Sequence, residues 1–292
     1  MPRSASAWLR CGSGEILWED LFKRAIEIAE EGFSVSPRLA EAISGEQDRL
    51  KLFRASRALF FSEDGTPKRE KEILTAPELA QTFRLVAEKG PSVFYEGAIA
   101  EDIVRAVNSS PVNPGKMTLE DLKEYEAPFR SPLKGKYRGL DVYTVPSPSA
   151  GGISLLESLN ILESFDPASM EREGAEFIRL FSEIQRVVFQ DRSHFLGDSD
   201  FTDVPAEKLL SGEWALEKRG ELRLADAPAA EAPEAHGNTT TSHISIVDGN
   251  GNVLSMTTTI EHIFGCGMVV PGRGFILNNE LTDFDAIPWL ED

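Results

Sequence analysis

The chain has 292 residues, of which 41% are hydrophobic, and this is enough to bury a substantial core in one large domain or two small ones. Its formal net charge of -18 at pH 7 argues against nucleic acids and anionic membranes as partners, because both are bound through lysine and arginine. The charge identifies no substrate, since a solvated acidic surface has the same composition.

The spacing of cysteine and histidine matches no metal-binding motif. The residues concerned are Cys11, Cys266, His194, His236, His243 and His262. We therefore expect no metal site. The sequence has no apolar run of roughly 18 to 20 residues, the length that spans a bilayer, and its first fourteen residues lack the apolar centre of a signal peptide. Localisation stays open.

Helical periodicity dominates the first three quarters of the chain. Apolar residues recur at three- and four-residue steps, and glycine or proline ends most of these runs. The pattern predicts helices over 18–29, 77–89, 94–107, 153–165 and 173–195. A further short helix is expected at Thr118-Leu119-Glu120-Asp121, because a threonine followed by an acid three residues later is a capping signal.

Strands are expected mainly near the C-terminus. The segment 134–145 reads as a strand with a bend, and an acidic linker occupies about 224–236. Beyond it, apolar and polar residues alternate from Ile244, and Asn250-Gly251 predicts a hairpin turn because both residues tolerate positive φ. The return strand covers 253–260, and another short strand is expected at 275–277. Helices followed by antiparallel strands predict an α+β fold.

Three consecutive threonines, Thr239, Thr240 and Thr241, join the linker to this hairpin. A chain cut before Thr241 would carry a hydroxyl nucleophile and an amine base in one residue, because an α-amino group titrates at about 8. Before the cut, the same hydroxyl could attack the preceding carbonyl. From the residues alone, a threonine-rich start of a strand is the more common explanation of such a run.

Possible partners for this threonine lie further along the chain. Thr259 stands on the return strand, with a hydroxyl that could face Thr241. Glu261, Glu280 and Asp283 supply carboxylates around two turns, and three converging anionic groups would favour a ligand with an ammonium group. The alternative, ordinary surface acids on an acidic chain, stays open on this evidence.

Several long motifs give the chain a resemblance to the γ-glutamyltransferase (γ-glutamyltranspeptidase) family of N-terminal nucleophile hydrolases. They are Thr241-Ser242-His243, VDGNGNV, TTTIEHIFGCG, PGRGFILNNELTDFDAIP, PSPSAGGI, DRSHFLGDSDFTDVP and EEGFSVS. The resemblance implies a four-layer αββα sandwich, here incomplete. It also implies one structural domain that comprises part of a large subunit (1–240) and the start of a small subunit (241–292).

The resemblance assigns roles to individual residues. It implies autocleavage between Thr240 and Thr241, with Thr241 as nucleophile and Thr259 in support. Glu261 matches a ligand-contacting position, and Glu280 and Asp283 match the acids that hold the α-amino group of the γ-glutamyl moiety. The family motif has Thr-Thr-His where this chain has Thr-Ser-His.

The implied reaction passes a γ-glutamyl group from glutathione or a similar donor to water, an amino acid or a peptide. We expect no cofactor for it. Family members are often periplasmic or secreted. The chain lacks matches to the family's carboxylate-binding arginine, its Ser-Ser pair and its Gly-Gly oxyanion segment, so we expect it to be truncated at both ends. Two alternatives remain: an acylase of the same superfamily with another acyl group, and a non-catalytic remnant.

Overall fold

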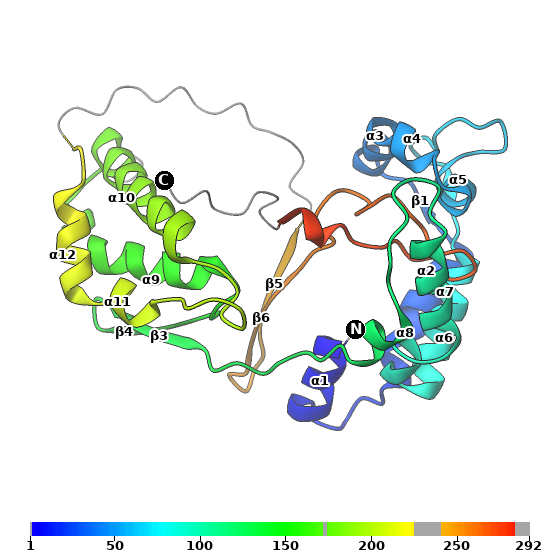
Figure 1. Ribbon diagram of the computed structural model, residues 1–292, viewed down its shortest axis with the longest axis horizontal. Coiled ribbons are helices and arrows are strands. Elements are labelled where there is room, and N and C mark those ends of the chain that lie inside the picture. The colour runs from blue at the N-terminus through cyan, green and yellow to red at the C-terminus, as the bar shows by residue number, and fades with distance from the viewer. Residues whose placement is uncertain (1, 172–173, 225–240, 284–292) are drawn as a thin grey trace. The chain divides into compact units, whose positions relative to one another are not determined.

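The computed structural model describes residues 2–171, 174–224 and 241–283 (Figure 1). The chain divides into two compact units: unit 1 comprises Met1–Ala127 and His236–Asp292, and unit 2 comprises Pro128–Ala235. Two compact units can belong to one structural domain, so the predicted single domain and the predicted subunit boundary before Thr241 both stay predictions.

Unit 1 is built from short helices with one hairpin and one antiparallel pair of two-residue strands. Its helices are α1 (Pro2–Cys11), α2 (Lys23–Glu31), α3 (Pro37–Gly45), α4 (Gln47–Leu50), α5 (Arg54–Phe60), α6 (Pro77–Lys89), α7 (Ala98–Asn108) and α8 (Leu119–Lys123), with 3₁₀ turns η1 (Glu19–Phe22), η2 (Pro91–Phe94) and η4 (Glu280–Asp283). Its strands are β1 (Phe33–Ser34), β2 (Ile73–Leu74), β5 (Ser242–Val247) and β6 (Val253–Thr258). β1 pairs with β2, and β5 with β6, both antiparallel.

Local sequence explains where several of these helices begin and end. Gly32 follows α2 at a φ of 83°, which a residue without Cβ adopts easily. The capping box predicted before α8 is present, since Thr118 and Asp121 exchange hydrogen bonds. The helix predicted over 94–107 begins later, at Ala98, because Gly97 takes a φ of 79° and interrupts the helical path. The helix predicted over 77–89 is confirmed as α6.

A segment near the C-terminus completes the core of unit 1. One cluster of buried side chains lies among α3, α4 and α5 and includes Val269; a second lies between α6 and α7 and includes Met268 and Val270. Val269 and Val270 are 2% and 0% exposed. Residues 268–270 therefore join two helical layers that are formed by residues some 160 or more positions earlier. The strand predicted at 275–277 is reduced to one bridge, between Val269 and Ile276.

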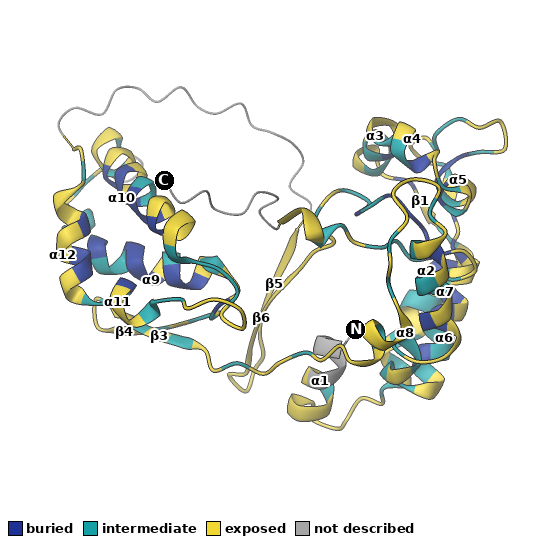
Figure 2. Ribbon diagram, in the orientation of Figure 1, coloured by how far each residue is buried: buried dark blue, intermediate teal, exposed yellow. Residues whose placement is uncertain are grey.

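The hairpin β5–β6 contrasts with this core, because every residue in both strands is exposed (Figure 2). Its register pairs Ser242 with Thr258 and Val247 with Val253. The Asp248 carboxylate closes the turn by accepting from the backbone N–H groups of Asn250 and Asn252, at 2.9 and 2.8 Å. The predicted hairpin and its turn are confirmed.

Unit 2 packs helices around a second core. It contains β3 (Leu133–Tyr137), β4 (Leu140–Thr144), α9 (Ala150–Leu162), η3 (Pro167–Ser169), α10 (Ala175–Phe195), α11 (Ala206–Leu209) and α12 (Gly212–Gly220). The strand with a bend predicted over 134–145 is a hairpin, because Arg138 and Gly139 both take positive φ and reverse the chain. Apolar residues of α9, α10 and α12 form the core, including Ile161, Ile184 and Ala215.

A group of charged side chains is buried inside unit 2. Glu157 of α9 and Asp191 of α10 are 1% and 3% exposed, and the Trp214 indole N–H lies 3.2 Å from one and 2.9 Å from the other carboxylate. Lys218 Nζ lies 2.9 Å from Asp191. Burial, followed by the hydrogen bond and charge of Asp191, raises the pKa of Glu157 to about 8. We refer to Glu157, Asp191, Trp214 and Lys218 as the buried acid cluster.

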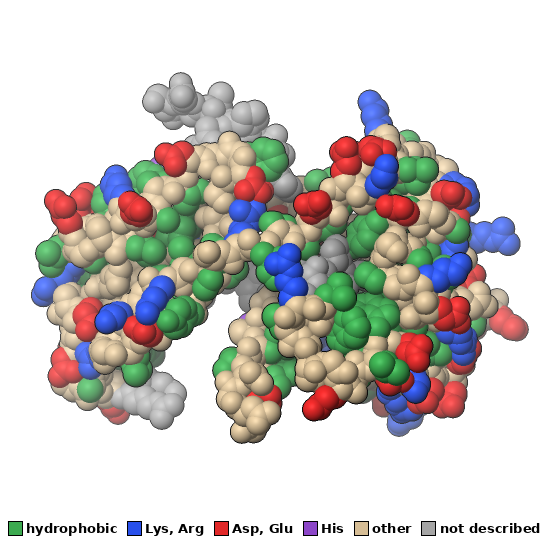
Figure 3. Space-filling model, turned by 90° about the horizontal axis from the view of Figure 1, so that it is seen from below, with side chains coloured by type: hydrophobic (Ala, Val, Ile, Leu, Met, Phe, Trp, Pro, Cys, Tyr) green, Lys and Arg blue, Asp and Glu red, His purple; other side chains and the backbone are tan. Residues whose placement is uncertain are grey.

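The predicted α+β class is confirmed by this mixture of helices and antiparallel strands. On the face drawn in Figure 3, acidic and basic side chains are scattered, with hydrophobic side chains between them. Within the described ranges, no helix is both long enough and apolar enough to cross a membrane.

Candidate active site

The pairing of β5 with β6 places Thr241 opposite Thr259. Ser242 pairs with Thr258 in an antiparallel ladder. The residue before Ser242 therefore faces the residue after Thr258. The Thr241 hydroxyl donates to Thr259 Oγ1 at 3.1 Å, so the predicted pair of hydroxyls is in contact. Thr240, the other side of the predicted cleavage site, lies outside the described residues.

The polar face of the hairpin continues beyond this pair. His243 Nδ1 lies 2.8 Å from Thr257 Oγ1, and its Nε2 lies 3.2 Å from Ser255 Oγ. Side chains two apart on a strand share a face, so His243 lies on the same face as Thr241. Thr257 and Ser255 are not among the residues selected from the sequence, although this period of two identifies them.

Thr259 also connects the hairpin to the first of the predicted acids. Its Oγ1 accepts from the Glu261 backbone N–H at 2.9 Å, in addition to the bond from Thr241. Glu261 has a φ of 69°, a conformation that non-glycine residues seldom adopt. The backbone therefore turns sharply at Glu261, directly after the strand that carries Thr259.

The Glu261 carboxylate is bonded to residues that follow much later. Its Oε2 accepts from the Asn279 side-chain amide and, at 3.1 Å, from the Thr282 hydroxyl. Its Oε1 lies 3.2 Å from His262 Nε2. Asn279 Oδ1 in turn accepts from the His262 backbone N–H at 3.0 Å. These bonds bring the segments around 261 and 279–282 together.

Glu280 and Asp283 lie three residues apart in the single turn η4. Burial raises the pKa of Glu280, and the charges of Asp283 and Glu261 and a hydrogen bond with Asp283 raise it further. Glu280 Oε1 is buried and accepts no hydrogen bond from any described residue. Among the residues that the structure describes, no lysine or arginine forms an ion pair with Glu280 or Asp283. Such a pair of acids is suited to a ligand that brings its own positive charge.

Backbone hydrogen bonds hold the two acid-bearing segments beside each other. Cys266 N–H donates to the Leu277 carbonyl at 3.1 Å, and Leu277 N–H donates to the Met268 carbonyl at 3.0 Å. The loop between them enters the core through Val269 and Val270. Glu261 and Glu280 thus lie just outside the two ends of one loop, whose residues 267–270 are buried.

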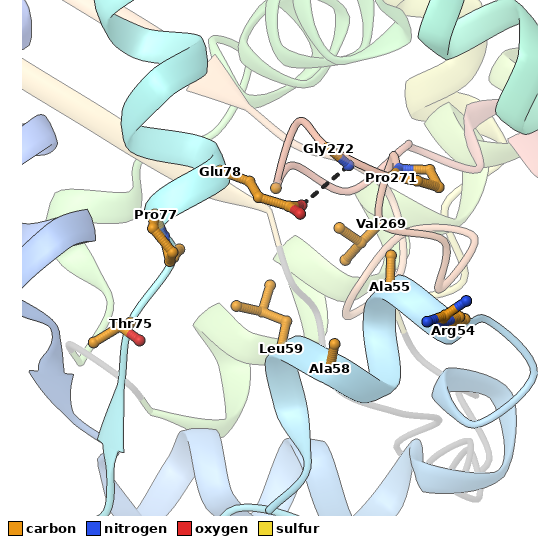
Figure 4. A pocket seen from close by; sticks show the side chains of 12 residues that line it. Arg54, Ala55, Ala58, Leu59, Thr75, Pro77, Glu78, Val269, Pro271 and Gly272 are labelled. Carbon is orange, nitrogen blue, oxygen red and sulfur yellow. Dashed lines mark hydrogen bonds between the residues drawn. The ribbon is translucent and has the colours of Figure 1, made fainter.

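A separate pocket of about 610 Å³ lies in unit 1 between α5 and α6 (Figure 4). Ala55, Ala58 and Leu59 line one side, and Glu78 accepts from the Gly272 N–H at 3.1 Å on another. No residue predicted for the active site lines it. In the described part of the chain, no group of three or more His, Cys, Asp or Glu residues is placed to hold a metal ion.

Comparison with known proteins decides the family. The family model described as gamma-glutamyltranspeptidase matches residues 5–292. The chain belongs to the γ-glutamyltranspeptidase family. A relative in Bacillus subtilis (strain 168), named glutathione hydrolase proenzyme, is 36% identical over 289 residues, which cover 92% of this chain and 48% of the relative. The chain therefore spans about half the length of the curated relatives that it matches.

Solved structures confirm the fold expected for a γ-glutamyltranspeptidase. A γ-glutamyltranspeptidase from Helicobacter pylori superposes with a TM-score of 0.72 at 26% identity, over 80% of this chain and 68% of that one. A cephalosporin acylase from Bacillus halodurans superposes with a TM-score of 0.82 at 27% identity, over 97% of this chain and 51% of that one. Both likenesses support the predicted N-terminal nucleophile hydrolase fold. The roles of Thr241, Thr259, Glu261, Glu280 and Asp283 stay predictions.

Proposed function

We propose that this γ-glutamyltranspeptidase family member transfers γ-glutamyl groups through an ester on Thr241, after autocleavage between Thr240 and Thr241. The donor is glutathione or another γ-glutamyl compound, and the acceptor is water, an amino acid or a peptide. One observation carries the proposal: a continuous set of contacts runs from the Thr241 hydroxyl through Thr259 and Glu261 to Asn279. It connects the nucleophile to the segment that bears Glu280.

The cut uses the same hydroxyl as the later reaction. Thr241 Oγ1 adds to the Thr240 carbonyl carbon, the C–N bond breaks, and the amine nitrogen takes the proton that the hydroxyl releases. Water then hydrolyses the ester, which leaves a carboxylate on Thr240 and a free amine on Thr241. The result is a large and a small subunit from one precursor, with no other reagent than water.

In turnover, Thr241 Oγ1 attacks the γ-carbonyl carbon of the donor. Its own α-amine accepts the hydroxyl proton, because an α-amino group with a pKa of about 8 is partly unprotonated near neutral pH. The proton then passes to the departing amine as the C–N bond breaks. Water or an acceptor amine attacks the ester and restores the hydroxyl. The hydrogen bond that the Thr241 hydroxyl donates to Thr259 orients this hydroxyl for the first attack.

Glu280 and Asp283 are proposed to hold the α-ammonium group of the donor. Both lack a cationic partner among the described residues, and an ammonium group donates up to three hydrogen bonds. This pairing favours γ-glutamyl donors over acyl groups without an α-amine.

A second function, hydrolysis of a different acyl amide, is favoured by the superposition on the cephalosporin acylase. The two functions differ in the donor that they accept. Parallel assays with γ-glutamyl-p-nitroanilide and glutaryl-p-nitroanilide distinguish them, since the second substrate lacks only the α-amine. Preferential turnover of the glutaryl compound overturns the γ-glutamyl assignment.

The proposed nucleophile is tested by intact-mass measurement of the purified chain after prolonged incubation. We expect a fragment that begins at Thr241. Thr241→Ala should stay whole and release no p-nitroaniline, whereas the matched control Thr239→Ala should be cut and active. A wild-type chain that stays whole contradicts self-processing. Unchanged turnover in Thr241→Ala places the nucleophile elsewhere.

A further inference from the structure

The loop that separates Glu261 from Glu280 has an unusual backbone. Glu261, Phe264 and Gly265 take positive φ values of 69°, 62° and 49°. Gly265 lies so close to the Leu277 carbonyl that a Cβ there would be 2.1 Å from its oxygen. A backbone of this shape costs free energy and persists only where its surroundings fix it. Its carbonyl groups also lie outside a regular ladder and need other donors.

Arg49 of α4 supplies those donors. Its Nη1 donates to the Gly265 carbonyl at 2.5 Å, and its Nη2 donates to the Ile263 carbonyl at 2.6 Å. Its charge is balanced by Glu46 one helical turn earlier, at 2.9 Å. The guanidinium is therefore held on one side by Glu46 and holds two loop carbonyls on the other. Because the guanidinium is planar and donates two bonds, it restrains both the position and the orientation of the loop backbone.

The carbonyls held by Arg49 lie directly after Glu261, on the loop that leads to Glu280. Ile263 is two residues from Glu261, and Gly265 precedes Cys266, whose N–H bonds to Leu277 next to the acid-bearing turn. Gly267 also lies against the Arg49 stem, since a Cβ there would be 3.0 Å from Arg49 Cγ. A shift of the guanidinium therefore moves the loop at residues 263–267, directly after Glu261.

We propose that Arg49 is a positioning residue that sets the affinity of the site for the α-ammonium group of the donor. It acts by fixing Glu261 and, through Asn279, Glu280. This inference rests on the proposed γ-glutamyl transfer. Arg49 touches neither the nucleophile nor the reacting carbonyl in this account, so its loss should weaken donor binding more than it slows the chemical step.

The test compares Arg49→Met and Arg49→Lys with the control Arg57→Met in the full chain. Arg57 is an exposed arginine on α5 for which the described structure shows no ion pair. We expect Arg49→Met to raise the KM for γ-glutamyl-p-nitroanilide by about 10- to 100-fold, with kcat per cleaved chain nearly unchanged. Arg49→Lys should be intermediate, because lysine donates without the planar guanidinium. The control should match the wild type.

Two further measurements separate positioning from a general loss of structure. Glutaryl-p-nitroanilide carries no α-ammonium group, so its kcat/KM in Arg49→Met should differ from that of the wild type by less than threefold. An equal fall in kcat/KM for both substrates overturns the proposal. Hydrogen exchange of peptides covering 259–267 should be at least tenfold faster in Arg49→Met, while α6 and α7 keep their protection. Unchanged exchange also overturns it, whether or not the wild type turns over. A wild type that turns over neither substrate contradicts the proposed function alone.

Discussion

The two units each hold a pair of neighbouring carboxyl groups, and the pairs differ in what surrounds them. In the buried acid cluster of unit 2, Glu157 and Asp191 share an indole donor and have the Lys218 ammonium beside them. In unit 1, Glu280 and Asp283 have no lysine or arginine partner among the described residues, and one oxygen of Glu280 is buried without a donor.

The difference teaches how to tell a structural acid pair from a binding acid pair. Both pairs raise the pKa of one member through burial and a second carboxyl group. The raised pKa alone therefore does not identify a functional site. The presence or absence of an internal cation distinguishes the two pairs. Where a lysine already neutralises the pair, no charge is left for a ligand; where none does, we propose that a ligand ammonium completes the site.

The largest effect is expected from removing that internal cation. Lys218→Met should lower the free energy of unfolding by about 3–5 kcal/mol, because Asp191 is left buried without its partner. Urea denaturation measures this. The matched control is Lys208→Met, which removes a lysine that lies over the same Trp214 ring at 4.2 Å but is exposed and pairs with no carboxylate among the described residues. Equal losses in the two variants contradict the role given to the ion pair.

In unit 1 the corresponding change should affect binding and leave stability intact. Glu280→Gln should raise the KM for a γ-glutamyl donor by about 10- to 100-fold, because a charge-assisted bond to the ammonium is replaced by a neutral one. Steady-state kinetics and urea denaturation together measure the two effects. Glu88→Gln, at an exposed acid of α6, is the control. A Glu280→Gln protein with wild-type KM removes Glu280 from the site.

The raised pKa of Glu157 predicts a pH dependence of stability in unit 2. The folded state keeps the Glu157 proton up to about pH 8, whereas the unfolded state releases it near 4.5. The folded state thus binds more protons in this window, and stability falls as pH rises through it, by at most about 1.4 kcal/mol per pH unit. Glu157→Gln should lack this contribution. Urea titrations at pH 5, 6.5 and 8 compare the slopes, and identical slopes in both proteins refute the prediction.

The smallest effect is expected from pH acting on Glu280. A protonated carboxyl group pairs poorly with an ammonium group, and the pKa of Glu280 is raised by burial and by its acidic neighbours. The KM for a γ-glutamyl donor should therefore rise a few-fold as pH falls toward that pKa, by at most about tenfold per pH unit. The KM of glutaryl-p-nitroanilide should not follow. A parallel rise for both substrates assigns the titration to another group.

Much of the candidate site could be predicted from sequence because it is local. The turn at Asp248–Asn252 fixes the register of the hairpin, and the register places Thr241 opposite Thr259. The helix end at Gly32 and the capping box at Thr118 likewise depend only on neighbouring residues. The residues alone left open whether Glu261, Glu280 and Asp283 form one site or are ordinary surface acids, and their individual roles came from the family resemblance.

The rest depends on residues far apart in the chain, which leave no periodic or local pattern. Arg49 reaches carbonyls 214 and 216 residues later, and nothing in the sequence around α4 marks it. Glu157 and Asp191 resemble ordinary polar residues of two helices until tertiary packing buries them together. The strand predicted at 275–277 is apolar because it enters a helical core, not because it extends a sheet.

The burial of residues 267–270, in the loop that follows the hairpin, has a consequence for the proposed cleavage product. A cut before Thr241 leaves two polypeptides whose side chains still fill the same interior, with Val269 and Val270 of one enclosed by helices of the other. Ser56, 0% exposed on α5, bonds to both Gly267 O and Val269 N across that division. The two fragments therefore cannot dissociate in the way that two folded proteins dissociate at a surface interface. Their dissociation is the opening of a hydrophobic core, and its rate is bounded by the rate at which unit 1 unfolds.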